Sequence, residues 1–499
     1  MIKIEHDTQP PQTHKGATPS ATKNYVDKHW QVNPKLSPDS WRLLDGLTVS
    51  KVGFGCYRLQ NPDHASALEK ALLSGVNLID SASNYGLGAA EVGIGQVLKK
   101  LFKAGKLSRE EVVITSKAGY IQGGDLTALT GAPYKEDGVY HFNEHMAYSL
   151  HPDFIDKQLR QSLERLQLET LDIFFAHNPE YILMALEEEG KDINQAREIF
   201  YQQLTNAFIR LEELCQEGLI ARYGVSSNTF GEAKDHPHAV DLARVCACSD
   251  SAAAHVAGRK KRGKLKVIQA PLNLLETGVL FTPSTTAKTF DGEEIVSTLE
   301  FAARKKLSVL TNRPLNVSIE GKMGLRLAPL PAVPEKPQNL VSAEEALAES
   351  LGGWPNWQDK PMFRLSVEGE VFADQAKGRL HADALIKQLI EPSVAAICQF
   401  AYQQNAPQAQ VQSYEQAMRT YCAYLIDLAA QAEKPVHDEL FKQLPQSSQP
   451  LTLQAVGAVA SLPGVTCVLW GARDSAYVDD MVEALQTPDF ANVENYFLG

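Results

Sequence analysis

The sequence predicts an α/β protein that folds as a (β/α)8 TIM barrel with a mostly helical insertion between strands seven and eight. From residue 50 onward, short runs rich in Val, Ile and Leu alternate with longer amphipathic stretches, as parallel strands joined by helices do. Eight such units in succession favour a closed barrel over an open sheet. The length of 499 residues is about twice that of one barrel, which predicts the insertion.

Each expected element follows from its local pattern. The strands are the apolar runs at 52–55, 76–80, 112–117, 171–177, 220–225, 265–270, 307–312 and 466–470. Amphipathic stretches predict helices at 63–75, 91–102, 152–166, 206–218, 293–306, 451–464 and 475–485. Gly218 is a plausible helix stop. We expect residues 118–150 to form a long, Gly-rich connection.

Three parts are expected along the chain. Two amphipathic segments, 382–404 and 411–433, predict a helical hairpin inside the insertion. Loops that follow barrel strands emerge at the catalytic face, so we expect the insertion beside that mouth. The expected boundaries are a polar, partly disordered N-terminal tail over 1–40, a barrel over 41–316 and 449–490, and an inserted helical subdomain over 317–448.

Composition excludes several classes of protein. The formal charge of −12 gives no basic footprint for nucleic acid or an anionic membrane. No apolar run suits a membrane helix, and the N-terminus lacks a leader pattern. Seven scattered cysteines do not form a disulfide framework, which favours a reducing cytoplasm. Cys246 and Cys248 lack further ligands at zinc spacing, so we expect no metal.

Four ionisable residues are expected at the C-terminal ends of successive strands, where barrel enzymes place catalytic groups. They are Asp80 and Tyr85 after strand two, Lys117 at the end of strand three and His177 at the end of strand four. A lysine that ends a buried strand needs a carboxylate partner, and Asp80 on the neighbouring strand is the natural one. A purely structural Asp80–Lys117 pair is the alternative.

The motifs that carry these residues resemble those of the aldo-keto reductase family. They are DSASNYG (80–86), TSKAG (115–119), LDIFFAHNPE (171–180), ARYGVSSN (221–228) and VIQAPLN (267–273). The resemblance implies hydride transfer from a nicotinamide nucleotide to an aldehyde or ketone, or the reverse oxidation. It makes Tyr85 the general acid, with Lys117 expected to lower the pKa of its phenol. Asp80 would orient Lys117, and neutral His177 would bind the carbonyl.

The resemblance also implies a set of nucleotide contacts. The GVSSN segment and Gln269 correspond to the family's residues that hold the nicotinamide carboxamide. Within GVSSN, the pair that matches the family's Ser-Asn is either Ser226–Ser227 or Ser227–Asn228. Asn312 and Arg313 replace the family's aromatic and serine, and Arg313 either contacts the pyrophosphate or forms a helix cap or rim salt bridge. Arg473 favours NADP(H) over NAD(H). The expected cofactor-binding residues are Gly55, Cys56, Ser226, Ser227, Asn228, Gln269, Asn312, Arg313, Leu315, Gly471, Ala472 and Arg473.

The substrate is expected to be a small carbonyl compound or alcohol. Tyr57, Arg58, Tyr120 and His145 are the expected substrate-binding residues, and His141 and Tyr148 lie on the same connection. Trp354 and Trp357 either cap the pocket or anchor the inserted helices. Two other functions compete: a Schiff-base aldolase, which an adjacent Asp80 disfavours by keeping Lys117 charged, and a nucleotide-binding regulatory protein with little turnover.

Overall fold

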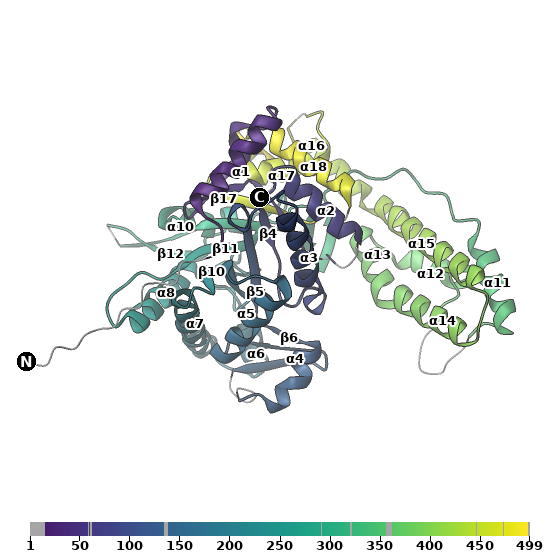
Figure 1. Cartoon of the computed structure of the whole chain (residues 1–499), viewed down its shortest axis with the longest axis horizontal. Coiled ribbons are helices and arrows are strands. Elements are labelled where there is room, and N and C mark those ends of the chain that lie inside the picture. The colour runs from purple at the N-terminus through teal and green to yellow at the C-terminus, as the bar shows by residue number, and fades with distance from the viewer. Residues whose placement is uncertain are drawn as a thin grey trace, which may run out of the picture. The chain divides into compact units, whose positions relative to one another are not determined.

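Eight parallel strands close into a barrel in the order in which they occur along the chain. The computed structural model describes residues 15–57, 59, 62–133, 138–290, 292–319, 322–355, 362–445, 447–472 and 474–497. The barrel strands are β3 (Val52–Gly55), β4 (Leu78–Asp80), β5 (Val113–Ala118), β9 (Leu171–His177), β10 (Ile220–Ser226), β11 (Leu265–Pro271), β14 (Ser308–Asn312) and β17 (Val465–Trp470). The predicted fold class is confirmed (Figure 1).

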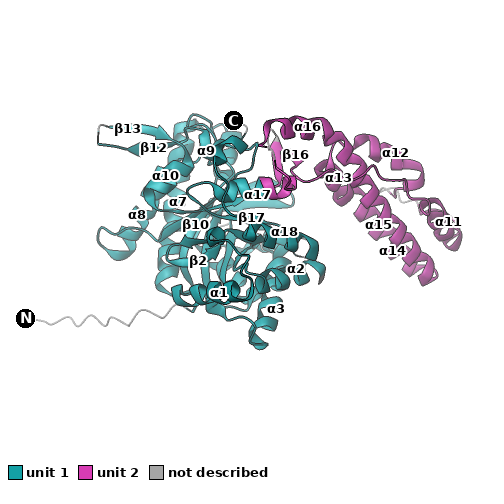
Figure 2. Cartoon of the chain, turned by 90° about the horizontal axis from the view of Figure 1, so that it is seen from above, with its two compact units in different colours: residues 1–314, 455–499 teal, residues 315–454 magenta. Residues whose placement is uncertain are grey.

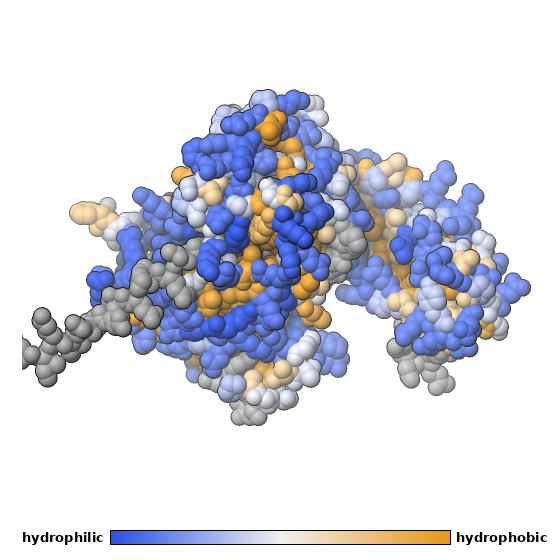
Figure 3. Space-filling view, in the orientation of Figure 1, coloured by the Kyte–Doolittle hydropathy of each residue, from blue (hydrophilic) through white to orange (hydrophobic). Residues whose placement is uncertain are grey.

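Helices surround the barrel on its outer side, one for each strand (Figure 1). They are α2 (Pro62–Leu73), α3 (Ala89–Lys103), α5 (Pro152–Leu166), α7 (Ile193–Gln216), α8 (Leu242–Ala257), α10 (Thr298–Lys305), α17 (Leu451–Ser461) and α18 (Ser475–Gln486). Hydrophilic residues cover much of the face in Figure 3. The apolar sides of the helices are buried, as at Ile94 and Leu98 of α3 and Ile155 and Leu159 of α5. The helix predicted at 293–306 is only partly present, because β13 (Glu293–Val296) precedes a shorter α10.

A hairpin contributes to the core at the N-terminal end of the barrel. It consists of β1 (Trp41–Leu44) and β2 (Leu47–Ser50), joined by Asp45 and Gly46, both at positive φ as a two-residue hairpin turn requires. Leu44, Leu47 and Val49 belong to one buried cluster with interior residues of six barrel strands. The hairpin therefore supplies apolar side chains to the barrel's own core.

The predicted N-terminal tail is partly wrong. Helix α1 (Pro19–Val32) begins at Thr18, whose side chain accepts the N–H of Ala21. Tyr25 is buried and its hydroxyl donates to the carbonyl of Leu72 at 2.6 Å. Few residues of α1 are buried, so its sequence is mostly polar and lacks the apolar pattern that predicts a helix.

The connection at 118–150 also contains regular structure. It forms β6 (Tyr120–Gln122), α4 (Gly123–Ala128), β7 (Val139–Asn143) and β8 (Met146–Ser149). The three strands pair as an antiparallel sheet in the order β6-β8-β7. Its core contains Ile121, Ala147 and Phe154 of α5, which fixes this sheet to the barrel's outer layer.

The chain divides into two compact units, residues 1–314 with 455–499, and residues 315–454 (Figure 2). The second unit contains the hairpin β15 (Asn316–Ile319) and β16 (Lys322–Arg326) and helices α11 (Leu340–Leu351), α12 (Leu365–Gln375), α13 (Arg379–Leu385), α14 (Glu391–Gln403), α15 (Gln408–Ala430) and α16 (Lys434–Gln443). Its own core includes Leu347, Ile397 and Tyr414. Trp354 packs against Tyr414 and so anchors these helices, whereas Trp357 lies outside the described residues.

One buried arginine ties this second unit together. Arg379 donates to Glu433 and to the main-chain carbonyls of Arg326, Ala328 and Pro329. Only 6% of Arg379 and 4% of Glu433 are exposed, so each charge depends on the other for compensation.

Candidate active site at the carboxyl ends of the barrel strands

A buried ion pair joins the ends of β4 and β5. Lys117 is fully buried, and its Nζ donates to Asp80 Oδ2 at 2.6 Å and to the carbonyl of Ser81 at 2.8 Å. Asp80 Oδ1 accepts from Thr115 Oγ1 and from Gln269 Nε2, both at 2.8 Å. The carboxylate of β4 is thus held by side chains of two other strands, β5 and β11.

Tyr85 lies on the other side of the ammonium group. It begins a 3-10 turn (Tyr85–Gly88), and its Oη is 3.4 Å from Lys117 Nζ. Burial lowers the pKa of Lys117, but Asp80 and Tyr85 outweigh burial and the pKa is raised, so the amine is charged. A neutral nucleophilic amine, which an aldolase needs, is disfavoured.

Two opposing effects act on the pKa of Tyr85, and the expected lowering by Lys117 is the smaller of them. Desolvation by the surrounding protein raises the pKa of Tyr85, and it outweighs the lowering by Lys117. The net direction is upward, opposite to the prediction. Tyr85 is therefore a protonated hydrogen-bond donor, as a general acid must be before it reacts.

His177 completes the group. Its ring centroid is 6.0 Å from that of Tyr85 and 5.0 Å from that of Tyr120. Burial, followed by the charge of Lys117, lowers the pKa of His177 well below its ordinary value, so the ring is neutral. Tyr148, on the 118–150 connection, is fully buried and donates to the His177 carbonyl at 2.9 Å. A Cβ at Gly119 would lie 2.7 Å from that carbonyl, so glycine permits the contact.

Three of the residues expected to hold the nicotinamide form one network. Gln269 Oε1 accepts from Ser226 Oγ at 3.2 Å and from Asn312 Nδ2 at 3.1 Å, while Gln269 Nε2 donates to Asp80. Ser227 instead bonds Thr229 through its hydroxyl and the Gln269 carbonyl through its N–H. This network connects the expected nucleotide contacts to the ion pair.

The other expected nucleotide contacts lie in several places. Gly55 and Gly471 approach each other, since a Cβ at Gly55 would lie 3.6 Å from the Gly471 nitrogen. Cys56 is buried, its N–H donates to the Asp80 carbonyl, and burial raises the pKa of its thiol well above the ordinary value. Ala472 is buried beside Gly471. Leu315 is the first residue of the second unit, and Arg473 lies outside the described residues.

Arg313 forms a salt bridge, one of the alternatives expected for it. Its Nη2 is 2.9 Å from Glu276 Oε1, and its φ is 56°. Asn273 donates to Glu276 and to the Arg313 carbonyl, which fixes the turn after β14.

Two of the expected substrate residues lie beside the four candidate catalytic residues. The ring of Tyr57 is 5.0 Å from Tyr85 and largely exposed, and Tyr120 packs on His177. His145 lies on the β7–β8 turn with 85% of its side chain exposed and contacts Glu144 and Asn143. His141 is exposed on β7. Arg58 lies outside the described residues.

A buried carboxyl group that the sequence did not predict lies next to this site. Glu180 is 1% exposed, and its Oε1 accepts the N–H of Asn228 at 2.9 Å. The only signal was its place in HNPE, three residues after His177. Nothing local in the sequence indicated burial.

The polar groups at this end of the barrel fit a polar ligand. Several buried side-chain atoms have no hydrogen-bond partner within the described part of the chain, which polar groups rarely tolerate without a ligand or water. They include Ser81 Oγ, Asn84 Oδ1, His177 Nδ1, Glu180 Oε2, Thr311 Oγ1 and Asn312 Oδ1. Donors and acceptors both occur, as a nicotinamide carboxamide and a carbonyl substrate require.

A pocket of about 320 Å³ lies next to this group. Tyr120, Asn84 and Ser83 line it together with residues of α4 and α5. Its two cations are paired, Lys157 with Asp125 and Arg165 with Glu91. The remaining lining is made mainly of neutral hydroxyl and amide groups.

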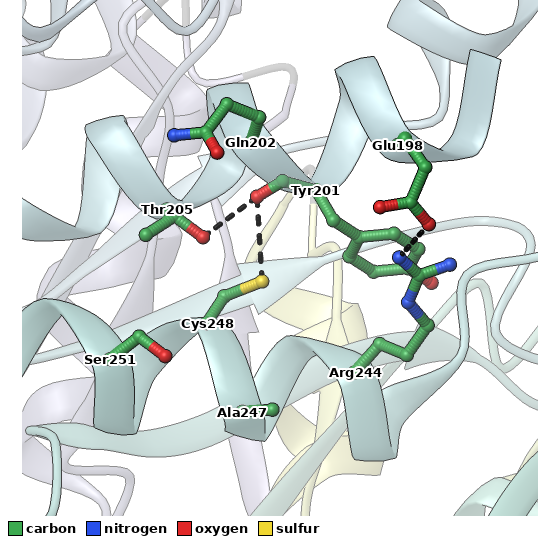
Figure 4. A pocket seen from close by; sticks show the side chains of 8 residues that line it. All are labelled: Glu198, Tyr201, Gln202, Thr205, Arg244, Ala247, Cys248 and Ser251. Carbon is green, nitrogen blue, oxygen red and sulfur yellow. Dashed lines mark hydrogen bonds and ion pairs between the residues drawn. The ribbon is translucent and has the colours of Figure 1, made fainter. Parts of the chain in front are cut away.

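A second pocket lies between α7 and α8 in the outer layer of helices (Figure 4). Arg244 stacks on Tyr201 at 3.9 Å and bonds Glu198 at 2.7 Å, while the Cys248 thiol donates to the Tyr201 carbonyl. These polar groups are used in packing one helix on the other, so the pocket carries no chemistry of its own.

The fold and the site together define a class of protein: a (β/α)8 barrel with a buried aspartate–lysine pair, a tyrosine and a neutral histidine at its strand ends. The model of the aldo/keto reductase family matches residues 51–249, so this part of the chain is similar to that family.

Individual relatives are distant. The NADPH-dependent D-xylose reductase of Candida boidinii is 27% identical over 196 residues, which are 37% of this chain and 50% of that protein. Aldose reductase C of Dictyostelium discoideum is 36% identical over 86 residues, 17% of this chain and 26% of that protein. An aldo-keto reductase from Bacillus halodurans of known structure is 16% identical with a TM-score of 0.44, covering 92% of this chain and 95% of that one. The chain spans about half the length of the curated xylose reductases it matches.

None of the described helices is long and apolar enough to cross a membrane.

Proposed function

We propose that the protein is an NAD(P)H-dependent oxidoreductase that interconverts a small aldehyde or ketone and its alcohol. The observation that carries the proposal is the position of Lys117 between Asp80 and the Tyr85 hydroxyl. A nicotinamide held at this end of the barrel would supply the hydride for the carbonyl carbon.

The protein's own residues account for the proton and for the orientation of the substrate. Tyr85 donates its hydroxyl proton to the carbonyl oxygen, and Lys117 stabilises the phenolate that this leaves. Asp80 holds Lys117 in place through the 2.6 Å contact. Neutral His177 donates a hydrogen bond to the same oxygen and so fixes its approach.

The residues that hold the nicotinamide are proposed to be those of the hydrogen-bonded network at the barrel mouth. Ser226, Gln269 and Asn312 present amide and hydroxyl groups that match a carboxamide. Asn228 and Ser227 follow Ser226 on the same segment.

Replacing Tyr85 with Phe tests the catalytic role. The ring is retained and only the dissociable proton is lost, so kcat is expected to fall by about 10²- to 10⁴-fold. Affinity for NADPH should remain within a few-fold of the wild type. Tyr402→Phe, on an exposed residue of the second unit, is the matched control. A Tyr85→Phe protein that reduces aldehydes at the wild-type rate would refute the proposed role.

We propose NADP(H) as the preferred nucleotide, because Arg473 follows the eighth strand in GARDS and suits a 2′-phosphate. The names of two relatives specify NADPH, those of three others NAD(P)H, and that of one NADH. Arg473→Ala should weaken NADPH binding by about 1–3 kcal/mol and leave NADH binding nearly unchanged. Equal losses for both nucleotides would contradict the assignment.

A further inference from the structure

The buried carboxyl group of Glu180 is not used in the proposed reaction. It lies in the segment that follows β9, three residues beyond His177, and only 1% of it is exposed. Oε1 accepts the N–H of Asn228 at 2.9 Å, whereas Oε2 is buried without a hydrogen-bond partner among the described residues. A buried carboxyl with one unsatisfied oxygen is costly, so it needs an explanation.

Glu180 is held firmly against the segment 226–228. Asn178, at a φ of 52°, donates its N–H to the Ser226 carbonyl at 2.6 Å. Its side chain donates to Tyr120 Oη at 2.7 Å. The segments that follow β9 and β10 are therefore joined by two hydrogen bonds, one between the main chains of Asn178 and Ser226 and one from the Asn228 N–H to the Glu180 side chain.

The charged and titratable groups around Glu180 come from three elements. Arg313, after β14, acts on it as a positive charge, although Arg313 is also paired with Glu276. Tyr120 of β6 and Tyr148 of β8 are the neighbouring phenols whose own ionisation Glu180 disfavours.

Burial dominates the titration of this group. It raises the pKa of Glu180 to about 7, and the Asn228 N–H and the charge of Arg313 oppose only part of that shift. Both the acid and the carboxylate are therefore populated near neutral pH.

We propose that Glu180 is a positioning residue that couples its own ionisation to the redox form of the bound nicotinamide. The proposal rests on the function proposed above, in which the segment 226–228 holds the carboxamide. The oxidised nicotinamide ring is positively charged and the reduced ring is neutral. An ionised Glu180 behind this segment therefore favours the oxidised nucleotide, and a protonated Glu180 removes that preference.

The reciprocal effect follows from linkage. If the oxidised nucleotide binds better to the carboxylate, then its binding displaces the proton from Glu180. Below about pH 7, NADP⁺ binding should release a proton that NADPH binding does not.

The test measures nucleotide binding by the full-length protein rather than turnover. Dissociation constants for NADP⁺ and NADPH are determined by calorimetry at pH 6 and pH 8, and their ratio is compared. The 2′-phosphate is common to both nucleotides, so its titration cancels in the ratio. For the wild type, the preference should shift toward NADP⁺ on the order of tenfold between these pH values, the size of one buried charge interaction at moderate separation.

Three variants separate charge from structure. Glu180→Gln keeps the acceptor for Asn228 without ionising, so its ratio should be independent of pH and match the wild type at pH 6. Glu180→Asp retains a carboxyl group and should restore a pH-dependent ratio, which a purely structural role does not predict. Glu188→Gln removes an exposed charge from α6 (Tyr181–Glu188) and should behave as the wild type does.

Proton release provides a second measurement, from calorimetry in two buffers of different ionisation enthalpy. At pH 6 the wild type should release more protons on NADP⁺ binding than on NADPH binding, and Glu180→Gln should release the same number with both nucleotides. The role of Glu180 is refuted if the wild type binds both nucleotides tightly with a ratio of dissociation constants that does not change with pH. It is also refuted if Glu180→Gln keeps the pH dependence of the wild type. Neither result contradicts the proposed function. Failure of the wild type to bind either nucleotide overturns the proposed function, and this inference with it.

Discussion

The ion pair beneath Tyr85 predicts a large loss of stability when only its cation is removed. Lys117→Met retains the aliphatic stem and deletes the ammonium group. The side chain of Lys117 is fully buried and that of Asp80 is 5% exposed, so the remaining carboxylate has little access to water. Thr115 and Gln269 continue to donate to its Oδ1, but Oδ2 loses the 2.6 Å contact. Breaking a buried pair on one side typically costs about 3–5 kcal/mol of unfolding free energy.

A double variant removes the negative charge that Lys117→Met leaves without a partner. Asp80→Asn, combined with Lys117→Met, keeps an oxygen that accepts from Thr115 and carries no charge, so about 2 kcal/mol should be recovered. Urea unfolding at pH 7 measures both changes. Because the chain has two units, the tryptophans of the second unit, Trp354 and Trp357, are replaced with Phe in every variant so that fluorescence reports on the barrel. A loss below about 1 kcal/mol, or a double variant no more stable than Lys117→Met, would refute the reasoning.

Two further predictions concern the other buried charges. The folded-state pKa of Glu180, about 7, lies above its ordinary value of 4.5, so the wild type should lose up to about 3 kcal/mol of unfolding free energy as pH rises from 4.5 through 7. Glu180→Gln should lack this loss in denaturant titrations at several pH values, and parallel curves for the two proteins would contradict the shift. Arg379→Met leaves Glu433 buried without its partner, so limited proteolysis within 315–454 should accelerate while the barrel resists cleavage. Arg419→Met, at a largely exposed position, is the control, and equal cleavage rates for both variants would count against the buried pair.

Periodicity predicted the barrel because each of its strands is a run of apolar residues bounded by polar turns. Leu171–His177 is an example, since every residue of that strand is buried. Helix α1 was not predicted because Tyr25 makes its contacts with residues 47 and 51 positions away in the sequence. The hairpin at 41–50 was not predicted, although Asp45-Gly46 is a sequence typical of a two-residue hairpin turn.

The candidate site was predicted in part for the same reason. Asp80, Lys117 and His177 end strands, and parallel strands bring their ends to one edge, so their proximity follows from the order of elements. Burial does not follow from that order. The direction of the Tyr85 pKa and the burial of Glu180 both depend on how much protein surrounds each group, which no local pattern encodes.

The strand that closes the barrel is separated from the one beside it by the whole inserted unit. β17 pairs with β14 on one side and with β3 on the other, and Val465 follows Asn312 by about 150 residues. At typical synthesis rates of about 5–20 residues per second, roughly 10–30 s pass on the ribosome between the seventh strand and the eighth. During that interval β3 and β14 are unpaired edges that invite association with other chains. A nascent chain that stalls within 315–454 should therefore depend on chaperones more than one that stalls after Trp470.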